Sequence, residues 1–318
     1  MSRLPGIPMI IAIIAASALA ACSKTADAPP PPAAAPASAP APESPPAAMQ
    51  VNAQAFKIGE LSAWALRDGS IELPNDNKVF GVGHTPEEVA AVLSAAGQPT
   101  DKLHLSIQPL LVKTPDHVLL FDTGAGSNFG PGAGQLAASL AEAGVDPQSV
   151  TDIFISHSHG DHVGGLVNAE GKLVFPNAAI HMSKPEWTFM SGQDQYKALI
   201  PVIKAKVDAF KPGAELVPGV VRAVEIKGHT PGHSGYRITS GSDTLLYVGD
   251  SVHHFVVSVQ KPDWPMSFDG DQALGARSRA AVIADSAASG QRIYAVHFPY
   301  PGLGKFAKQG DGFAWVGE

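Results

Sequence analysis

The chain has 318 residues, of which 45% are hydrophobic and 16% are charged, and its formal net charge at pH 7 is −7. A length of this order suits one large or two small globular domains, and the hydrophobic fraction is sufficient to build a core. The acidic balance provides no basic face for a polyanion, so nucleic acid is not expected as a partner.

The first 21 residues have the pattern of a secretory signal peptide. Arg3 gives a basic start, and residues 7–21 form an apolar run of about fifteen residues, which is short for a membrane span. The run ends in Leu19-Ala20-Ala21-Cys22, which resembles a bacterial lipobox and predicts a lipid on Cys22. A plain signal peptide with a chance cysteine is the alternative. Because Cys22 is the only cysteine, no disulfide bond within the chain is expected.

Residues 22–49 are predicted to form a tether. They consist almost wholly of Pro, Ala and Ser, a composition that cannot bury apolar area and that favours an extended chain. The expected organisation is therefore a lipoprotein signal peptide at 1–21, the tether at 22–49 and one globular domain at 50–318. It predicts a protein of the cell envelope, at the outer membrane or in the periplasm, that meets the membrane through lipidated Cys22.

Strand and helix patterns alternate in the globular part. Short β-like runs predict strands at 104–112, 117–121, 152–156, 178–182, 220–226, 244–248 and 292–296. Apolar periodicity predicts helices at 86–96, 133–143, 184–190, 196–210 and 270–289. This alternation indicates a layered α/β protein with mostly buried sheets.

Several predicted strands end in a turn that carries aspartate or histidine. The segments are LLFDTG (119–124), DIFISHSHGDH (152–162), VEIKGHTPGH (224–233), LLYVGD (245–250) and IYAVH (293–297). Open sheets build active sites at the carboxyl ends of their strands, on a rigid support. We therefore expect these turns to meet in one site.

The segment ISHSHGDH (155–162) has the spacing of a metal site. His157 and His159 are two positions apart, so in an extended chain they point to the same side and can bind one ion together. Gly160 permits a sharp turn, after which Asp161 and His162 can bind a neighbouring ion. Unrelated surface histidines are the alternative, but four ionisable groups directly after a buried strand favour a metal site.

This motif resembles the signature of the metallo-β-lactamase superfamily, and the resemblance spans roughly residues 55–318. It implies an α/β fold of the αββα sandwich type and a dinuclear site whose later ligands lie at successive strand ends. The implied ligands are His157, His159 and His229 for one metal, Asp161, His162 and His297 for the second, and Asp250 as a bridge. Five imidazoles and two carboxylates suit two Zn²⁺ ions, although iron, manganese or cobalt also fit.

The resemblance also implies metal-assisted hydrolysis, in which a hydroxide held between the two metals attacks a carbonyl or phosphoryl centre. Asp161 is expected to pass a proton to the leaving group, so Asp161 and Asp250 are the predicted catalytic residues. Asp122 is expected to orient a ligating imidazole or to brace the metal loop, with turn capping as the alternative. His233 is not expected to be a ligand. Either His253 or His254 is a candidate to face the pocket.

Two further stretches resemble the methyl parathion hydrolase-like branch, which neighbours the quorum-quenching lactonases. They are residues 66–74 (LRDGSIELP) and the tail from His297 to Val316. That resemblance implies a small neutral substrate, namely a lactone, an aryl ester or a phosphotriester. Trp187 and Phe189 are candidates for an aromatic pocket wall, with core packing as the alternative.

A β-lactam hydrolase and a lipid-anchored binding protein with little catalysis are the alternative functions. The sequence leaves the oligomeric state open, a dimer included.

Overall fold

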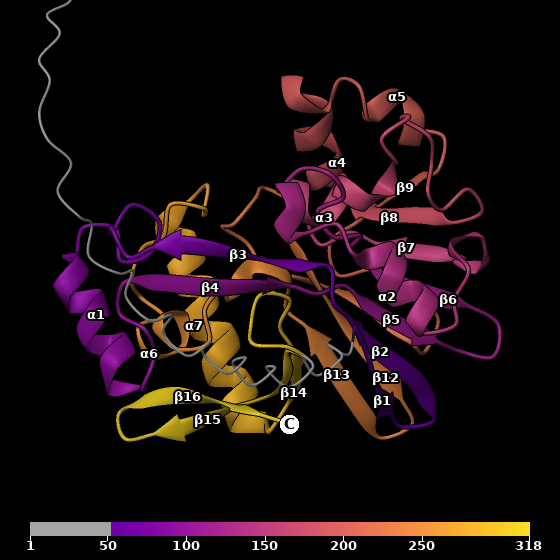
Figure 1. Ribbon diagram of the computed structural model, residues 1–318. Helices are drawn as coiled ribbons and strands as arrows, with labels where there is room; N and C mark the ends of the chain where they lie inside the picture. Colours follow the sequence, from indigo (N-terminus) through magenta and orange to yellow (C-terminus); the bar gives the residue numbers. More distant parts are fainter. Residues whose placement is uncertain (1–51) are drawn as a thin grey trace, which may run out of the picture. The chain divides into compact units, whose positions relative to one another are not determined.

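Two seven-stranded sheets dominate the computed structural model, which describes residues 52–318 (Figure 1). In the first sheet the strands follow the order β1 (Ala53–Ile58), β2 (Leu61–Leu66), β5 (Leu110–Lys113), β6 (Val118–Phe121), β7 (Asp152–Phe154), β8 (Ala179–Ser183) and β9 (Val207–Phe210). The second contains, in order, β10 (Glu215–Val217), β11 (Val221–Glu225), β12 (Ser234–Ser240), β13 (Asp243–Tyr247), β14 (Arg292–Tyr294), β15 (Leu303–Gln309) and β16 (Gly312–Gly317). A separate antiparallel ribbon pairs β3 (Gly69–Pro74) with β4 (Lys102–Ile107).

The predicted signal peptide, Cys22 and the predicted tether lie outside the described residues. Between residues 52 and 318, no helix combines the length and the apolar character that a membrane span requires.

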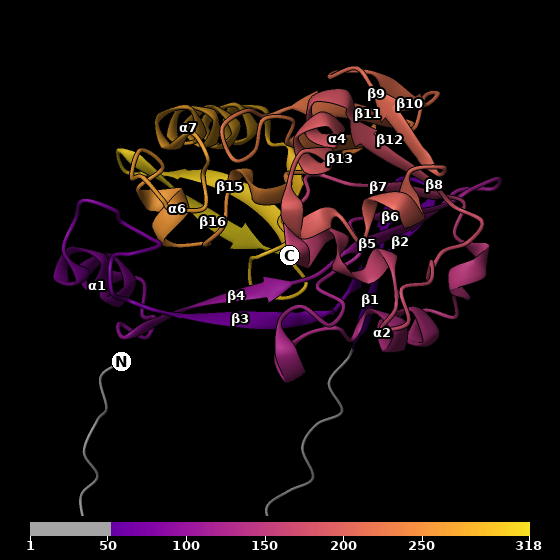
Figure 2. The ribbon, with the colours of Figure 1, turned by 90° about the horizontal axis from the view of Figure 1, so that it is seen from above.

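Helices cover the outer face of each sheet (Figure 2). The first sheet packs its outer side chains against Leu140 of α2, Met190 of α4 and Ile203 of α5. On the second sheet, Val259 of α6 and Ile283 of α7 fill the outer layer. The helices are α1 (Pro86–Ala95), α2 (Leu136–Glu142), α3 (Gly160–Val163), α4 (Lys184–Ser191), α5 (Ile200–Ile203), α6 (Val257–Gln260) and α7 (Gln272–Ser289). The expected αββα layering is therefore confirmed.

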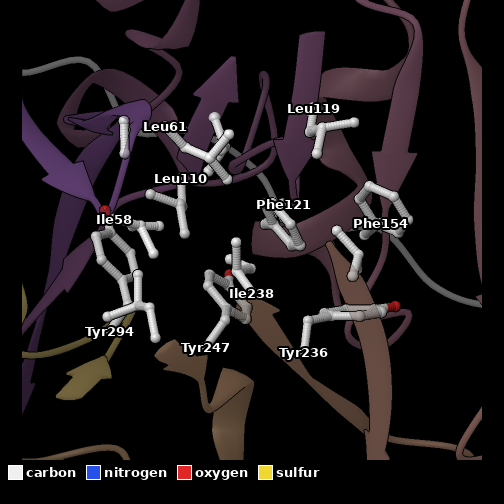
Figure 3. Packing of buried hydrophobic residues seen from close by; sticks show 14 of the residues in the cluster. Ile58, Leu61, Leu110, Leu119, Phe121, Phe154, Tyr236, Ile238, Tyr247 and Tyr294 are labelled. Carbon is white, nitrogen blue, oxygen red and sulfur yellow. The ribbon is translucent and has the colours of Figure 1, made fainter. Parts of the chain in front are cut away.

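Aromatic side chains fill the space between the two sheets (Figure 3). Phe121 and Phe154 of the first sheet stack with their ring centroids 4.9 Å apart, and Tyr236 of the second sheet meets Phe121 edge-on at 5.6 Å. Tyr247 and Tyr294 stack at 5.7 Å beside them. Rings of this size each bury about 150–250 Å², so this cluster is a large part of the force that holds the sheets together.

Most of the predicted elements are present, with two errors. The strand predicted at 104–112 is two strands, β4 and β5, which belong to different sheets. The break falls at Gln108-Pro109, because proline has no N–H for a strand ladder. The helix predicted at 196–210 is also wrong. Only α5 is helical there, and the segment ends in strand β9, which pairs in parallel with β8. Seven strands have no counterpart among the predicted elements, namely β1, β2, β3, β10, β12, β15 and β16.

Strand direction brings the histidine-bearing turns together. In the first sheet β6, β7 and β8 run parallel, so the turns after Phe121 and Phe154 leave from the same edge. In the second sheet β13 and β14 run parallel, and β11 has the same direction because it is antiparallel to β12, which is antiparallel to β13. Every predicted ligand therefore follows a strand that points toward one end of its sheet.

Asp152, at the start of β7, is predicted to stabilise the fold in a pH-dependent way. Burial raises its pKa, but hydrogen bonds from His181, Thr151 and His117 outweigh burial and lower the pKa to about 2. Because an unfolded aspartate titrates near 3.9, this stabilisation is complete above about pH 4 and is lost as the pH falls toward 2. We expect Asp152→Asn to lower the free energy of unfolding at pH 7 by on the order of 1–2 kcal/mol, and to change it little near pH 2.

Urea denaturation at a series of pH values measures this effect. Asp116→Asn is the matched control, because Asp116 is a nearby exposed carboxylate that accepts no side-chain hydrogen bond. An equal loss of stability at all pH values would contradict the prediction.

Candidate metal centre

All seven predicted ligands lie together, in two adjacent groups of potential ligand atoms. Within each group these atoms are no more than 4.8 Å apart. One group contains His157, His159, His229 and Asp250, and the other contains Asp161, His162 and His297. The grouping matches the division that the sequence predicts.

The first group is a triangle of imidazole nitrogens. His157 Nε2 lies 3.0 Å from His159 Nδ1, and His229 Nε2 lies 3.1 Å and 3.0 Å from these two atoms. His157 and His159 extend from the loop after β7, and His229 comes from the loop after β11 in the other sheet. Three nitrogens from two sheets thus point at one place.

Asp250 lies between the two groups. Its Oδ2 atom is 3.4 Å from His229 Nε2 of the first group and 3.2 Å from His297 Nε2 of the second. Its Oδ1 atom is 3.2 Å from His162 Nε2 and 3.1 Å from His297 Nε2, on the side of the second group. Asp161 Oδ2 completes the second group at 3.5 Å from both of these nitrogens. Asp250 therefore has the position that a bridging carboxylate needs.

Several buried polar atoms of this centre have no hydrogen-bond partner within the described part of the chain. They are His162 Nε2, Asp250 Oδ1 and both ring nitrogens of His253. Buried polar atoms are almost always paired, and unpaired ones indicate a missing ion or water. A divalent cation between imidazoles and carboxylates supplies such a partner, so the residues present fit the metals that the sequence implies.

Burial and charge act differently on the two groups. Burial is the main cause that lowers the pKa of His229 to about 3 and that of His157 well below its usual value, so these imidazoles are neutral ligands at pH 7. Around His162, burial acts in the same direction, but the carboxylates of Asp250, Asp161 and Asp122 outweigh it and raise the pKa. Carboxylates thus concentrate negative charge on the second group, where a cation would neutralise it.

Asp122 makes the contacts expected of a residue that supports the ligands. Its carboxylate accepts hydrogen bonds from the backbone N–H of Ser156 at 2.7 Å and from the Ser156 hydroxyl at 2.6 Å. It also lies 2.7 Å from His162 Nδ1, which leaves His162 Nε2 free to face the centre. Both alternatives within the prediction, orienting an imidazole and bracing the loop, are confirmed.

His233 supports Asp250 from outside the ligand set, as expected. Its Nε2 atom accepts a hydrogen bond from the backbone N–H of Asp250 at 2.9 Å, and its Nδ1 atom lies 3.0 Å from the carbonyl oxygen of Ile226. Gly249 is required beside it, because a Cβ atom at that position would lie 2.6 Å from His233 Nε2. The histidine therefore sets the position of the bridging aspartate.

A buried pair that the sequence analysis missed orients His229. Asp269 Oδ1 lies 3.0 Å from His229 Nδ1, and its other oxygen accepts a hydrogen bond from the fully buried Arg279 guanidinium at 3.1 Å. A carboxylate behind a ligating imidazole fixes the ring and raises its affinity for metal. No local motif marks Asp269, since it lies 40 residues beyond the histidine.

The structure shows which of the candidate residues His253, His254, Trp187 and Phe189 lie beside the metal centre. His253 faces the centre, with Nε2 3.2 Å from Asp250 Oδ2, whereas His254 accepts hydrogen bonds from the backbone N–H groups of Val256 and Val257. Phe189 lines a cavity beside the metal centre, whereas Trp187 packs into the outer core of the first sheet.

Two cavities flank the metal centre and meet at His159 and Phe268. The larger, of about 440 Å³, is bordered by Phe189, Pro231 and Leu274, with Lys227 and Asp271 also on its wall. The smaller, of about 270 Å³, is lined by Phe129, Ile71 and Leu105 and reaches Asp161, Asp250 and His297. Phe129 and Phe268 are 42% and 37% exposed, so both cavities have an accessible aromatic side chain on their walls.

Comparison with known proteins identifies the family. Residues 106–282, more than half of the chain, match the Metallo-beta-lactamase superfamily. The chain belongs to this superfamily. The solved structure of AidC, a dizinc quorum-quenching lactonase in complex with the product N-hexanoyl-L-homoserine, is similar with a TM-score of 0.78 and 32% identity, over 84% of this chain and 97% of that chain.

Other metallo-β-lactamase superfamily proteins match to differing extents. The hydrolase AbOPH has a TM-score of 0.77 and 25% identity, over 85% of this chain and 99% of that chain. An N-acyl homoserine lactonase from Bacillus sp. is 27% identical over 175 residues, which are 48% of this chain and 66% of the lactonase. A ribonuclease Z from Salinibacter ruber is 38% identical over 79 residues, which are 25% of this chain and only 21% of the ribonuclease.

The pairing of Asp269 with His229 predicts an effect on metal binding. We expect Asp269→Asn to weaken zinc binding by the first group about 10–100-fold, because the amide oxygen is a poorer acceptor and holds the imidazole less firmly. Competition with a chromogenic zinc chelator measures the affinity. Asp271→Asn is the control, since the exposed Asp271 caps the start of α7 outside the ligand groups and asparagine also caps helices well. Equal affinities for the two variants would contradict the prediction.

Proposed function

We propose that this chain is a zinc-dependent hydrolase that opens a lactone or cleaves an aryl ester or a phosphotriester. The observation that carries the proposal is the position of Asp250, whose carboxylate lies 3.1–3.4 Å from imidazole nitrogens of both ligand groups. His157, His159 and His229 would hold one ion, Asp161, His162 and His297 would hold the other, and Asp250 would touch both. When bound, two such ions activate water as a nucleophile and polarise the carbonyl or phosphoryl oxygen of the substrate.

Asp161 is placed to move the proton that hydrolysis requires. It lines the smaller cavity, and its side chain is 11% exposed, compared with 5% for Asp250. Burial raises its pKa, but His162 and His297 outweigh burial and lower it to about 2, so Asp161 is ionised at neutral pH. An ionised carboxylate can accept a proton from the attacking water through an oxygen that does not hold the ion and pass this proton to the leaving group.

The cavities favour a neutral substrate with an apolar part. Apart from histidines, Lys227 is the one basic residue among the described residues that line the larger cavity, and none lines the smaller cavity. A nuclease would instead need several cations for phosphate groups. The similarity to AidC, which was solved with an acyl homoserine product, adds support for a lactone with an acyl chain.

A substrate panel tests the proposal. The zinc-loaded protein is expected to hydrolyse an N-acyl homoserine lactone and an aryl acetate faster than a cephalosporin, with a phosphotriester as the fourth substrate. Asp250→Ala should lower kcat/KM by at least about 10²-fold, because it removes the carboxylate between the ligand groups. Asp263→Ala, which removes an exposed carboxylate, is the control.

Specific results would contradict the proposal. Turnover confined to the cephalosporin would make the protein a β-lactamase. Two bound zinc ions with no turnover of any ester, lactone or phosphotriester would favour a binding protein with the fold of an enzyme. One iron per chain without hydrolysis would exclude a zinc hydrolase altogether.

We also propose that the protein is held at the cell envelope by a lipid on Cys22. The small residues before this cysteine and the Pro- and Ala-rich segment after it support the proposal. Cys22→Ala is expected to move the protein from the membrane fraction to the soluble fraction, because the acyl chains provide the membrane affinity. Immunoblots of fractionated cells measure this shift. A variant that stays in the membrane fraction would contradict lipid anchoring.

A further inference from the structure

A fully buried carboxylate joins the two loops that carry the first group of histidines. Glu186, in the first turn of α4, is 0% exposed and lies outside the ligand set. We propose that Glu186 is a positioning residue that holds these two loops at the separation in which their histidines bind one metal ion. The inference rests on the proposed dinuclear metal centre.

Four hydrogen bonds from the two loops converge on this carboxylate. Oε1 accepts from the backbone N–H of Ser158 at 2.9 Å and from the Ser158 hydroxyl at 2.7 Å. Oε2 accepts from the Thr230 hydroxyl at 2.7 Å and from the backbone N–H of Gly232 at 3.0 Å. Each oxygen thus serves one loop, and the carboxylate joins them.

The donors lie directly beside the ligands. Ser158 is the residue between His157 and His159, and Thr230 follows His229. A shift of either donor therefore moves a ligating imidazole. Because the three imidazole nitrogens lie only about 3 Å apart, even a small change in loop separation alters their geometry.

Other contacts hold α4 itself against the same loops. The Ser183 hydroxyl, at the start of α4, donates to the carbonyl oxygen of Gly232 at 2.6 Å. Gly232 has no room for a side chain, since a Cβ atom there would lie 2.1 Å from the backbone nitrogen of Glu186. The Tyr196 hydroxyl donates to the carbonyl oxygen of Ser158. The first turn of α4 is therefore a fixed platform for the carboxylate.

The chemistry of Glu186 argues for positioning rather than for general stability. None of the ion pairs among residues 52–318 includes Glu186, and its buried carboxylate is held by four hydrogen bonds. Burying a carboxylate in this way is costly, and apolar residues of similar volume often stabilise a core as well or better. An ionised carboxylate does provide what an apolar residue cannot, namely directional acceptors on two sides.

Zinc occupancy of the full-length protein across a series of buffered free-zinc concentrations tests this inference. Wild type is expected to bind two ions. In Glu186→Gln the amide oxygen can keep the Ser158 contacts, but the NH₂ group faces the N–H of Gly232, so one ion should bind about 10–100-fold more weakly. Glu186→Ala should bind that ion more weakly still. The second ion, held by Asp161, His162 and His297, should keep its affinity in both variants.

Two controls separate positioning from a loss of stability. Asp152→Asn is expected to destabilise the fold from the first residue of β7, where the side chain contacts neither Glu186 nor a ligand. It should leave both zinc affinities unchanged even where it lowers the unfolding midpoint as much as the Glu186 variants do. Asp122→Asn should weaken mainly the other ion, because Asp122 contacts His162. If the Glu186 variants do not fold, Thr230→Val removes a single donor, and it should weaken the first ion several-fold.

Each outcome is decisive. Wild type that binds fewer than two ions overturns the proposed metal centre and this inference with it. Wild type that binds two ions, with variants at Glu186 and Thr230 that either bind both unchanged or lose both in parallel, overturns the inference alone. The experiment measures metal occupancy, so its result does not depend on whether the protein hydrolyses any tested substrate.

Discussion

The hydrogen bonds of the Asp122 carboxylate are the interaction on which the rest of the site depends. It receives Ser156 and His162 from the first sheet, and the Tyr247 hydroxyl, at 2.6 Å, from the second. Asp122 adopts φ of +57°, a conformation that costs a non-glycine residue energy and that persists at functional sites where surrounding contacts enforce it. The aromatic core between the sheets also contacts the metal loop directly, because the Tyr236 hydroxyl donates to the carbonyl oxygen of Ile155 at 2.6 Å. Packing of the two sheets and the geometry of the ligands are therefore linked through two tyrosine hydroxyls.

Buried carboxylates support the other ligand loops in the same way. Glu186 joins the loops of Ser158 and Thr230, and Asp269 connects His229 to Arg279 on α7. Each carboxylate is buried and fully hydrogen-bonded, which is the condition under which buried charge is tolerated. These hydrogen bonds fix the loops that carry the ligands. The positions of the ligating side chains are therefore well defined although the loops have no regular secondary structure.

The sequence predicts the ligands much better than it predicts their supports. The ligands occur in short motifs at strand ends, so local spacing is enough to find them. Asp269 and Glu186 act on residues 28 to 46 positions away, and no local pattern records such contacts. Ser183-Lys184-Pro185-Glu186 even has the form of a helix capping box, which would assign the glutamate to its own helix, whereas its side chain faces the metal loops.

The strand error at Gln108-Pro109 has a related cause. Gln108 turns inward to donate to the carbonyl oxygens of Ala295 and Phe298, and only the tertiary structure shows these partners.

Metal ligands border both cavities, but the apolar part of the cavity walls comes mostly from other segments of the chain. The ligands follow strands of the two sheets, whereas the apolar wall residues come mostly from β3, β4, α4, α7 and two loops that carry Phe129 and Phe268. A similarity confined to the ligand loops therefore carries little information on the substrate, as the 79-residue match to a ribonuclease Z illustrates. A similarity that also covers the walls carries more, and the likeness to AidC extends over 84% of the chain. An ion-binding motif does not record these apolar side chains, and exchanging such side chains is a route by which one metal centre can serve different electrophiles.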